Sequence, residues 1–214
     1  MKYDPQAMQN YTSVQEGFTE HYKAAPPWDI GKPQAPFLTV ADQIKGPVLD
    51  VGCGTGSTAI FFAAKGHAVT GIDFVEKAIE RARSKATEQG LAVNFLVKDA
   101  MTLSSWPARF ASVIDSGLFH VYAGQDQKQA QQLYVQGLAH VLNPGGRLFL
   151  LSFTEEAPEG GVSQQELMDI FADGWEIESV QQVTGEINPA FLAEHPEAFS
   201  AAGPKMWFAI IRRM

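Results

Sequence analysis

Residues 48–58 read VLDVGCGTGST and set an acidic side chain beside a run of glycines. Gly52, Gly54 and Gly56 alternate with other residues, and Asp50 lies two positions before the first glycine. Because glycine carries no side chain, such a turn lets the backbone approach a ligand closely. The dinucleotide fingerprint requires a further glycine at position 57, where this chain has Ser57. A carboxylate at the turn also repels a pyrophosphate, so these residues favour a ligand with a positive ammonium group.

Further acidic residues and a histidine follow apolar stretches downstream. Asp73 closes GIDF, 17 residues after Gly56. An acid at about this spacing suits two ribose hydroxyls, although Asp73 could instead cap a helix that starts near residue 75. In DSGLFHVY, residues 115–122, Asp115 and His120 lie where an open α/β sheet binds its ligands. His120 is the candidate for a general base or for a contact to the reacting molecule, with packing at the strand end as the alternative.

Regular elements must position these residues, and the hydrophobic pattern defines them. Stretches rich in Val, Ile and Leu predict strands at 48–51, 68–73, 93–97, 110–117 and 147–153. Helices are predicted at 57–66, 75–90, 127–142 and 164–173. Two further strands are predicted at 175–184 and 207–212, and a turn is predicted at 143–146. Alternating strands and helices indicate βαβ units and a largely parallel sheet that is covered on both faces.

The two ends of the chain read differently from this alternation. Residues 1–25 carry apolar side chains at helical spacing, residues 26–36 contain four prolines and predict an ordered loop, and residues 37–44 predict another helix. The segment 188–205 holds three prolines and several aromatic residues, and we expect it to form an insertion over the sheet.

The composition limits the class of protein. The chain has 214 residues, one cysteine and a formal net charge of −8. This length fits about one domain, and a single cysteine cannot form a disulfide within the chain. The negative net charge argues against nucleic acid as a partner. The sequence shows no signal-peptide pattern, and its apolar runs are shorter than the roughly 20 residues that cross a bilayer. We therefore expect a cytoplasmic protein without a membrane partner, and the histidines show no spacing typical of a metal site.

The glycine loop resembles a known family motif. VLDVGCGTG, residues 48–56, resembles motif I of the class I S-adenosyl-L-methionine (SAM)-dependent methyltransferases, and LNPGGRLFLLSF, residues 142–153, is similar to their helix-turn-strand signature. The resemblance covers residues 48–153 and, more loosely, the chain to 213. It implies a Rossmann-like, doubly wound α/β fold in which helices cover both faces of a mostly parallel, seven-stranded sheet. It also implies SAM as cofactor and S-adenosyl-L-homocysteine (SAH) as product.

The same resemblance implies roles for individual residues. Asp50 and the loop residues Gly52, Cys53, Gly54 and Gly56 would lie along the amino-acid part of SAM. Asp73 would bind the ribose, and Phe74 would lie against the adenine. Asp99, Ala100 and Met101 resemble the segment that reads the adenine edge, with a helix cap or a plain loop as the alternative. Asp115 belongs to this cofactor-binding set because of its expected place at the mouth of the site.

A second resemblance lies ahead of the glycine loop. PPWDIGKPQ, residues 26–34, is similar to a PWDxGxPxP element of small-molecule methyltransferases for thiols, thiopurines, halides or toxic heterocycles, including the tellurite-resistance type. It implies that residues 1–45 form a helical lid, followed by a methyltransferase domain at 46–214. Trp28 would stack near the sulfonium, a contact worth about 0.5–2 kcal/mol, or simply cover the core. Asp29 and Gln34 would contact the cofactor, although the chain departs from the element at Ala35.

These observations together predict a SAM-dependent methyltransferase for a small, fairly apolar acceptor. A sulfur or nitrogen nucleophile is favoured, and the segment 188–205, with Phe191, Phe199 and the adjacent Met206, is expected either to wall the acceptor pocket or to form a surface excursion. The alternatives are a nicotinamide-dependent oxidoreductase on a Rossmann fold and a non-catalytic SAM-binding module. Both a monomer and a homodimer are compatible with the sequence.

Overall fold

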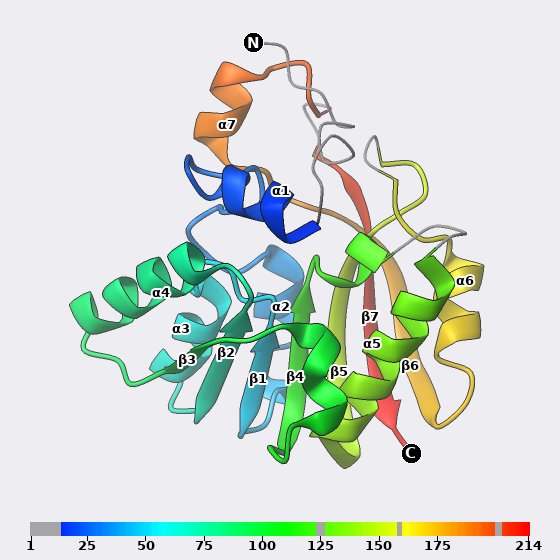
Figure 1. The fold of residues 1–214 in the computed structure, drawn as a ribbon. Coiled ribbons are helices and arrows are strands. Elements are labelled where there is room, and N and C mark those ends of the chain that lie inside the picture. Colours follow the sequence, from blue (N-terminus) through cyan, green and yellow to red (C-terminus); the bar gives the residue numbers. More distant parts are fainter. Residues whose placement is uncertain (1–13, 123–126, 158–159, 200–202) are drawn as a thin grey trace.

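The computed structural model describes residues 14–122, 127–157, 160–199 and 203–214, and its centre is one seven-stranded sheet. The strand order is β3-β2-β1-β4-β5-β7-β6, and only β7 runs antiparallel to its neighbours. The bounds are β1 (Val48–Val51), β2 (Val69–Asp73), β3 (Asn94–Val97), β4 (Phe110–Ser116), β5 (Leu142–Phe153), β6 (Trp175–Thr184) and β7 (Lys205–Arg213). The predicted mostly parallel α/β sheet is confirmed, and Figure 1 shows β7 pointing opposite to β4.

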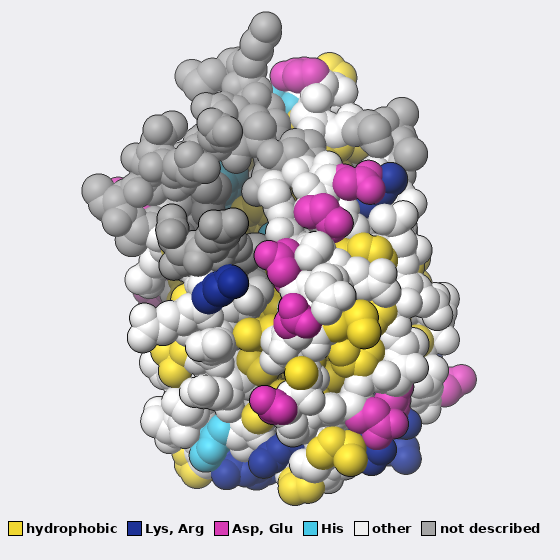
Figure 2. Space-filling model, turned by 90° about the vertical axis from the view of Figure 1, so that its right-hand side faces the viewer, with side chains coloured by type: hydrophobic (Ala, Val, Ile, Leu, Met, Phe, Trp, Pro, Cys, Tyr) yellow, Lys and Arg dark blue, Asp and Glu magenta, His cyan; other side chains and the backbone are white. Residues whose placement is uncertain are grey.

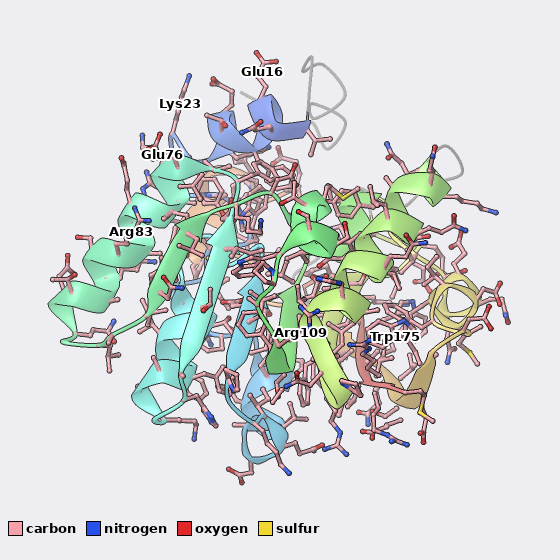
Figure 3. The ribbon with its side chains drawn as sticks, turned by 60° about the horizontal axis from the view of Figure 1, so that its bottom comes forward. Glu16, Lys23, Glu76, Arg83, Arg109 and Trp175 are labelled. Carbon is pink, nitrogen blue, oxygen red and sulfur yellow. The ribbon has the colours of Figure 1, made fainter. Side chains whose placement is uncertain are left out.

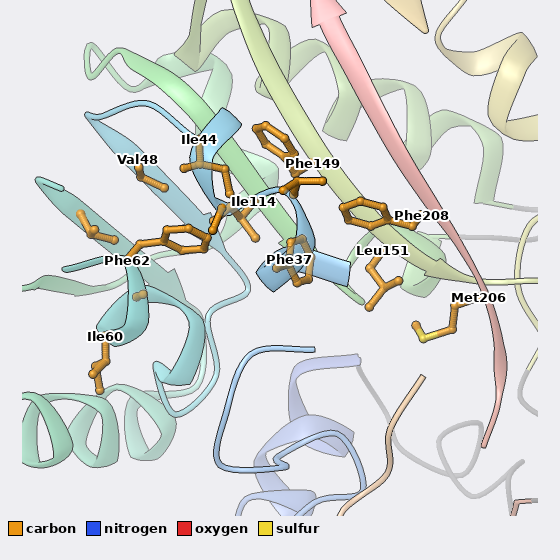
Figure 4. Packing of buried hydrophobic residues seen from close by; sticks show 14 of the residues in the cluster. Phe37, Ile44, Val48, Ile60, Phe62, Ile114, Phe149, Leu151, Met206 and Phe208 are labelled. Carbon is orange, nitrogen blue, oxygen red and sulfur yellow. The ribbon is translucent and has the colours of Figure 1, made fainter. Parts of the chain in front are cut away.

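Each face of the sheet packs against its own set of helices. One core cluster joins residues of α2 (Ala35–Thr39), α3 (Ser57–Ala64) and α4 (Glu76–Glu88) to one face, and the other joins α5 (Lys128–Val141) and α6 (Gln164–Ile170) to the opposite face. Successive strand residues point to opposite faces, so Phe149 lies in the first cluster and Leu150 in the second. Figure 4 shows the first cluster, where Phe37 packs edge-on against Phe208 with ring centroids 5.4 Å apart.

The N-terminal region divides into a core part and a part over the sheet. Phe37 and Ile44 are buried in the first cluster, so residues 35–44 belong to the core of the domain. Helix α1 (Val14–His21) and the loop that follows lie beyond the carboxyl ends of β1, β2 and β4, together with α7 (Pro189–Glu194) (Figure 1). Of the described chain, residues 14–34 thus lie over these strand ends, and we refer to them as the lid. Residues 1–13, which the predicted helical lid includes, lie outside the described residues.

Three elements differ from the sequence prediction. The helix predicted at 37–44 is instead α2 followed by a 3₁₀ turn, η2 (Ala41–Gln43). The predicted turn at 143–146 lies within β5 as an irregularity, since the register with β4 shifts between Phe110↔Leu142 and Ser112↔Arg147. Gly145 takes a φ of 76° there, which the glycine allows without strain. The segment 188–205 contains a short helix, α7, that the sequence pattern does not predict; Asn188 bonds to the N-terminal loop, and Phe199 packs in the first core cluster.

Apart from Asp50 and Asp115, the charged side chains of the described residues are at least partly exposed. Figure 3 shows Glu16 and Lys23 of the lid region projecting away from the sheet, whereas Arg83 of α4 reaches the Phe95 carbonyl of β3 at 2.7 Å. On the face seen in Figure 2, Lys and Arg side chains gather mainly along the lower edge, while acidic side chains are spread above them. Two arginines near the end of β7 are paired, Arg147 with Glu178 and Arg212 with Glu176. None of the described helices is long and apolar enough to cross a membrane.

Candidate active site

Two adjoining cavities open at the carboxyl ends of the strands, below the lid. The larger has a volume of about 490 Å³, and the smaller one of about 60 Å³. The larger cavity runs from Asp73 and Phe74 at the end of β2 to His120 and Met206 beyond β4 and on β7. The smaller cavity lies along the glycine loop and is lined mostly by polar groups. The position agrees with the general rule that open α/β sheets bind ligands beyond the carboxyl ends of their strands.

The three glycines of the loop make room for protein atoms as well as for the cavity. All have positive φ, and a Cβ on Gly54 would lie 2.6 Å from Tyr22 Oη. A Cβ on Gly56 would lie 2.6 Å from the Phe95 ring, and one on Gly52 would lie 3.1 Å from Leu118. The expectation that side chains are absent only to admit a ligand is therefore incomplete. The glycines also let the loop pack tightly between the lid, β3 and the turn after β4.

Asp50 is buried at the edge of the smaller cavity, with an exposure of 1%. Burial raises the pKa of Asp50 to about 8, against the opposing hydrogen bond from the Ala59 N–H. Among the described residues, neither Asp50 Oδ2 nor the buried Ser57 Oγ has a hydrogen-bond partner. Buried polar atoms without partners are rare in folded proteins. The carboxylate and the hydroxyl together fit the ammonium and carboxylate groups of an amino acid.

Cys53, between the first two glycines, also lines the smaller cavity. Burial raises the pKa of its thiol well above the ordinary value. The thiol therefore stays protonated at neutral pH, which gives it little nucleophilic character.

Asp73 lines the larger cavity and is also held by the backbone. Its Oδ2 accepts the Gly54 N–H at 3.0 Å, and its Oδ1 accepts the Val75 N–H at 2.9 Å. Burial raises the pKa of Asp73 to about 6, while both hydrogen bonds lower it. Each carboxylate oxygen has a second lone pair. Asp73 thus bonds the N–H of Val75, the N-cap residue of α4, but α4 has no side-chain cap, and the Asp73 carboxylate keeps acceptor capacity for a ligand.

The segment after β3 contributes to the same cavity through some of its residues. Phe74 and Ala100 line the cavity. Asp99 accepts the Met101 N–H at 2.9 Å through its side chain, which caps the 3₁₀ helix η3 (Ala100–Ser105). The Asp99 carboxylate thus caps a helix, which is the alternative role expected for this segment. Because the Met101 N–H donates to this carboxylate, it is already occupied.

Asp115 differs from its expected place at the mouth of the site. The residue is fully buried, and its carboxylate accepts the Leu118 N–H at 2.7 Å and the Tyr134 hydroxyl at 2.8 Å. Burial raises the pKa of Asp115 to about 6. The carboxylate points into the turn that follows β4, where the N–H groups of Leu118 and Phe119 donate to it. Asp115 therefore shapes the wall of the cavity from behind.

His120 lies on the wall of the larger cavity, within the 3₁₀ helix η4 (Phe119–Tyr122). Burial lowers its pKa to about 4, so the imidazole is neutral at neutral pH. The Phe153 N–H donates to His120 Nδ1 at 3.4 Å, which places the ring proton on Nε2. The ring also packs on Phe153 with centroids 4.4 Å apart. A neutral imidazole of this kind donates a hydrogen bond more readily than it takes up a proton.

Trp28 and Tyr22 join the lid to the cavities. The Trp28 Nε1–H donates to Tyr22 Oη at 3.1 Å, and the Trp28 ring contacts Phe18 with centroids 5.3 Å apart. Both residues line both cavities. Sequence reasoning placed Trp28 at the site but treated Tyr22 only as part of a helical pattern. The spacing of Phe18 and Tyr22 is that of apolar residues on a helix, and it does not indicate where the Tyr22 hydroxyl lies.

Hydrogen bonds fasten the lid loop to two distant segments. The Gln34 side chain binds the backbone N–H and C=O of Glu186, both at 2.8 Å. Asn188 Nδ2 donates to the Asp29 carbonyl at 2.8 Å. Thr55 Oγ1 donates to the Asp29 carboxylate at 2.9 Å, so the loop is also attached to the glycine turn. The amide of Gln34 and the carboxylate of Asp29, both expected at the cofactor, thus hold the lid loop in place.

We predict that Asn188→Ala lowers stability by about 1–3 kcal/mol, because the partly buried Asp29 carbonyl loses its donor and α7 loses its cap. For a domain of this size the melting temperature should fall by about 2–12 °C. Thermal unfolding followed by circular dichroism measures the change. Asn94→Ala is the control, since Asn94 is exposed and bonds only weakly to Thr70 at 3.4 Å. Equal melting temperatures for the two variants would contradict the attachment of the lid through Asn188.

Known proteins resemble this chain in sequence and in fold. Residues 48–146 match the family model described as a methyltransferase domain. The chain is 34% identical over 193 residues to the 2-heptyl-1-hydroxyquinolin-4(1H)-one methyltransferase of Mycobacteroides abscessus, covering 86% of this chain and 80% of that protein. The chain belongs to the class I SAM-dependent methyltransferases. The nicotinamide-dependent and non-catalytic alternatives have no support from these relatives.

Two further relatives agree with this assignment. The probable thiol methyltransferase 2 of Arabidopsis thaliana is 30% identical over 152 residues, covering 68% of this chain and 65% of that protein. A solved structure from work on the conversion of a disulfide bond into a thioacetal group during echinomycin biosynthesis has a TM-score of 0.77 at 33% identity. It covers 93% of this chain and 92% of the other.

Proposed function

We propose that this chain transfers the methyl group of SAM to a small, largely apolar molecule with a readily ionised S–H, N–H or O–H group. The observation that carries the proposal is the unpartnered Asp50 Oδ2 beside the glycine turn. SAM supplies an activated methyl group on a sulfonium, so the protein's task is to bind, orient and exclude water. The adjoining larger cavity supplies room for an acceptor.

The residues around the two cavities fit the parts of SAM in turn. Asp50 would bind the ammonium group and Ser57 the carboxylate of the amino-acid part, since both have unpartnered buried oxygens. Asp73 would bind the ribose hydroxyls through the lone pairs its backbone bonds leave open. Phe74 and Ala100 would flank the adenine. An ammonium group beside Asp50 would also favour the ionised carboxylate, which burial alone disfavours.

The acceptor would occupy the end of the larger cavity away from the glycine turn. This end is lined by Leu151, Phe153, Ile187, Pro204 and Met206, with His120 in the wall. Apolar walls keep water out, which favours a reaction between a cationic methyl donor and an anionic acceptor. Met206 lines the larger cavity and belongs to the first core cluster, as does Phe199, against which Phe191 packs.

We propose that His120 orients the acceptor by donating from Nε2. The lowered pKa and the hydrogen bond at Nδ1 speak against a strong general base at this position. Acidic acceptors fit best, because they lose their proton without such a base. A thiol is one example, and the names of two relatives include a thiol and a hydroxyquinolinone. The relatives therefore support oxygen as an acceptor atom beside the sulfur and nitrogen favoured from the sequence.

The test is transfer of a labelled methyl group from SAM to a panel of thiols, N-hydroxy heterocycles, N-heterocycles and phenols. We expect turnover with acidic, planar or apolar members and none with polar amines of high pKa. If no member of any class is methylated while SAM is bound, the proposed small-molecule acceptor is wrong.

Asp73→Ala is expected to weaken the binding of both SAM and SAH by about 100-fold or more, because two hydrogen bonds to a charged group, about 1.5–3 kcal/mol each, are lost. Isothermal titration calorimetry with each compound measures the effect. Asp169→Ala, on the distant helix α6, serves as control and should leave both affinities unchanged. Unaltered affinities in Asp73→Ala would place the ribose elsewhere.

A further inference from the structure

The two cavities meet at a narrow junction beneath the lid. Five residues line both cavities, namely Tyr22, Trp28, Gln34, Gly52 and Ser116. If the amino-acid part of SAM lies in the smaller cavity and its nucleoside in the larger one, the atoms that connect them pass this junction. The sulfonium and its methyl group are those connecting atoms. This step rests on the proposed function.

Tyr22 places an oxygen at the junction. The residue is only 3% exposed, and its Oη lies directly over the glycine turn, 2.6 Å from where a Cβ of residue 54 would be. The Trp28 Nε1–H donates to this oxygen at 3.1 Å and so occupies one of its lone pairs. Burial raises the pKa of the phenol well above its ordinary value, which keeps the group neutral. The second lone pair is available to a ligand.

We propose that Tyr22 Oη contacts the sulfonium and its methyl group when SAM is bound, and that Trp28 fixes the direction of this contact. A phenol oxygen attracts the positive sulfonium and its polarised methyl hydrogens. The attraction disappears in SAH, whose sulfur is neutral and carries no methyl group. Tyr22 therefore gives the site a preference for the substrate form of the cofactor over the product form.

Tyr22→Phe tests the assignment, because it removes the oxygen and keeps the ring. We expect the variant to bind SAM about fivefold more weakly and to bind SAH within about twofold of the wild type. Calorimetric titration of the ligand-free protein with each compound gives the two dissociation constants and their ratio. Tyr122→Phe is the matched control, since the Tyr122 ring packs on Tyr134, 5.2 Å away, and should leave both constants unchanged.

A second variant separates the contact from a general effect on the lid. Trp28→Phe removes the N–H that orients Tyr22 Oη, so it too should lower the preference for SAM over SAH. Equal weakening of SAM and SAH in Tyr22→Phe, or no weakening of either, would overturn the Tyr22 assignment while the proposed function stands. Wild-type protein that binds neither compound would overturn the proposed function and this contact together.

Discussion

Replacing Asp50 by asparagine is expected to abolish most SAM binding and, at the same time, to stabilise the ligand-free protein. Removing one partner of a buried ion pair costs about 3–5 kcal/mol, so SAM affinity should fall by a factor of about 100 or more. In the free protein the buried Asp50 carboxyl has no such partner, and its pKa is raised to about 8. At pH 7 folding must therefore protonate this carboxyl, a cost that an asparagine avoids, and we expect a gain on the order of 2 kcal/mol.

The pH dependence gives this prediction its sharpest measurement. An acid whose pKa rises on folding stabilises the fold fully below its unfolded pKa, and that stability is lost as the pH rises through the folded pKa. For Asp50 the window runs from the ordinary value of 3.8 to about 8, whereas those of Asp73 and Asp115 end at about 6. Between pH 6 and 8, wild-type stability should therefore fall by up to about 1.4 kcal/mol per pH unit, and Asp50→Asn should remove this slope.

Chemical denaturation across this pH range, without ligand, measures both curves. Asp169→Asn is the control and should follow the wild type. If the variant keeps the slope, the Asp50 carboxyl does not cause the pH dependence. If the variant binds SAM with wild-type affinity, the carboxyl does not contact the cofactor.

Gly56→Ala is expected to destabilise the protein by about 3 kcal/mol or more, the largest stability effect among the loop glycines. The positive φ of 79° costs an alanine about 1–2 kcal/mol. The new Cβ would also lie 2.6 Å from the Phe95 ring and 2.9 Å from the Ala82 Cβ, which adds about 1–3 kcal/mol of overpacking. The melting temperature should fall by about 6–12 °C.

Alanine variants of two other glycines separate the cost of backbone strain from the cost of steric crowding. Gly66→Ala has a φ of 90° with no atom within 4 Å of the new Cβ, so it measures the backbone cost alone. Gly54→Ala adds a clash with the Tyr22 hydroxyl, at the lid and not in the core. We expect Gly54→Ala to unfold near the temperature of Gly66→Ala but to bind SAM about tenfold more weakly. A Gly66→Ala variant as unstable as Gly56→Ala would show that backbone strain alone explains the glycines.

Local sequence patterns predict much of the sheet and the part of the site around the glycine turn. The apolar runs at 48–51 and 110–116 are strands because both faces of the central strands are covered, and a glycine turn after the first strand is a local signal. Asp50 and Asp73 therefore lie at the cavities as expected. The bulge at 143–146 was not predictable, because Pro-Gly-Gly reads equally as a turn, and only the register with β4 keeps it within a strand.

Residues whose function depends on distant partners are invisible to such patterns. Asp115 reads as a strand-end acid, but the Tyr134 hydroxyl, 19 residues away on α5, turns its carboxylate inward. Tyr22 reads as one apolar position of a helix, and only the packing of the lid brings its hydroxyl over Gly54. Asn188 lies in the segment 188–205 that reads as an insertion, and no local signal connects it to the Asp29 carbonyl 159 residues earlier.

The bonds from Gln34 to Glu186 and from Asn188 to Asp29 join the lid loop to a segment that follows β6. A shortened chain that ends after β5 would keep the glycine turn, Asp50 and Asp73, yet it would lose the strand beside β5 and the anchors of the lid loop. The segment that anchors the lid loop is thus synthesised well after the acidic residues of the pocket. Cofactor capture during synthesis should accordingly wait until residues beyond β7 have been made.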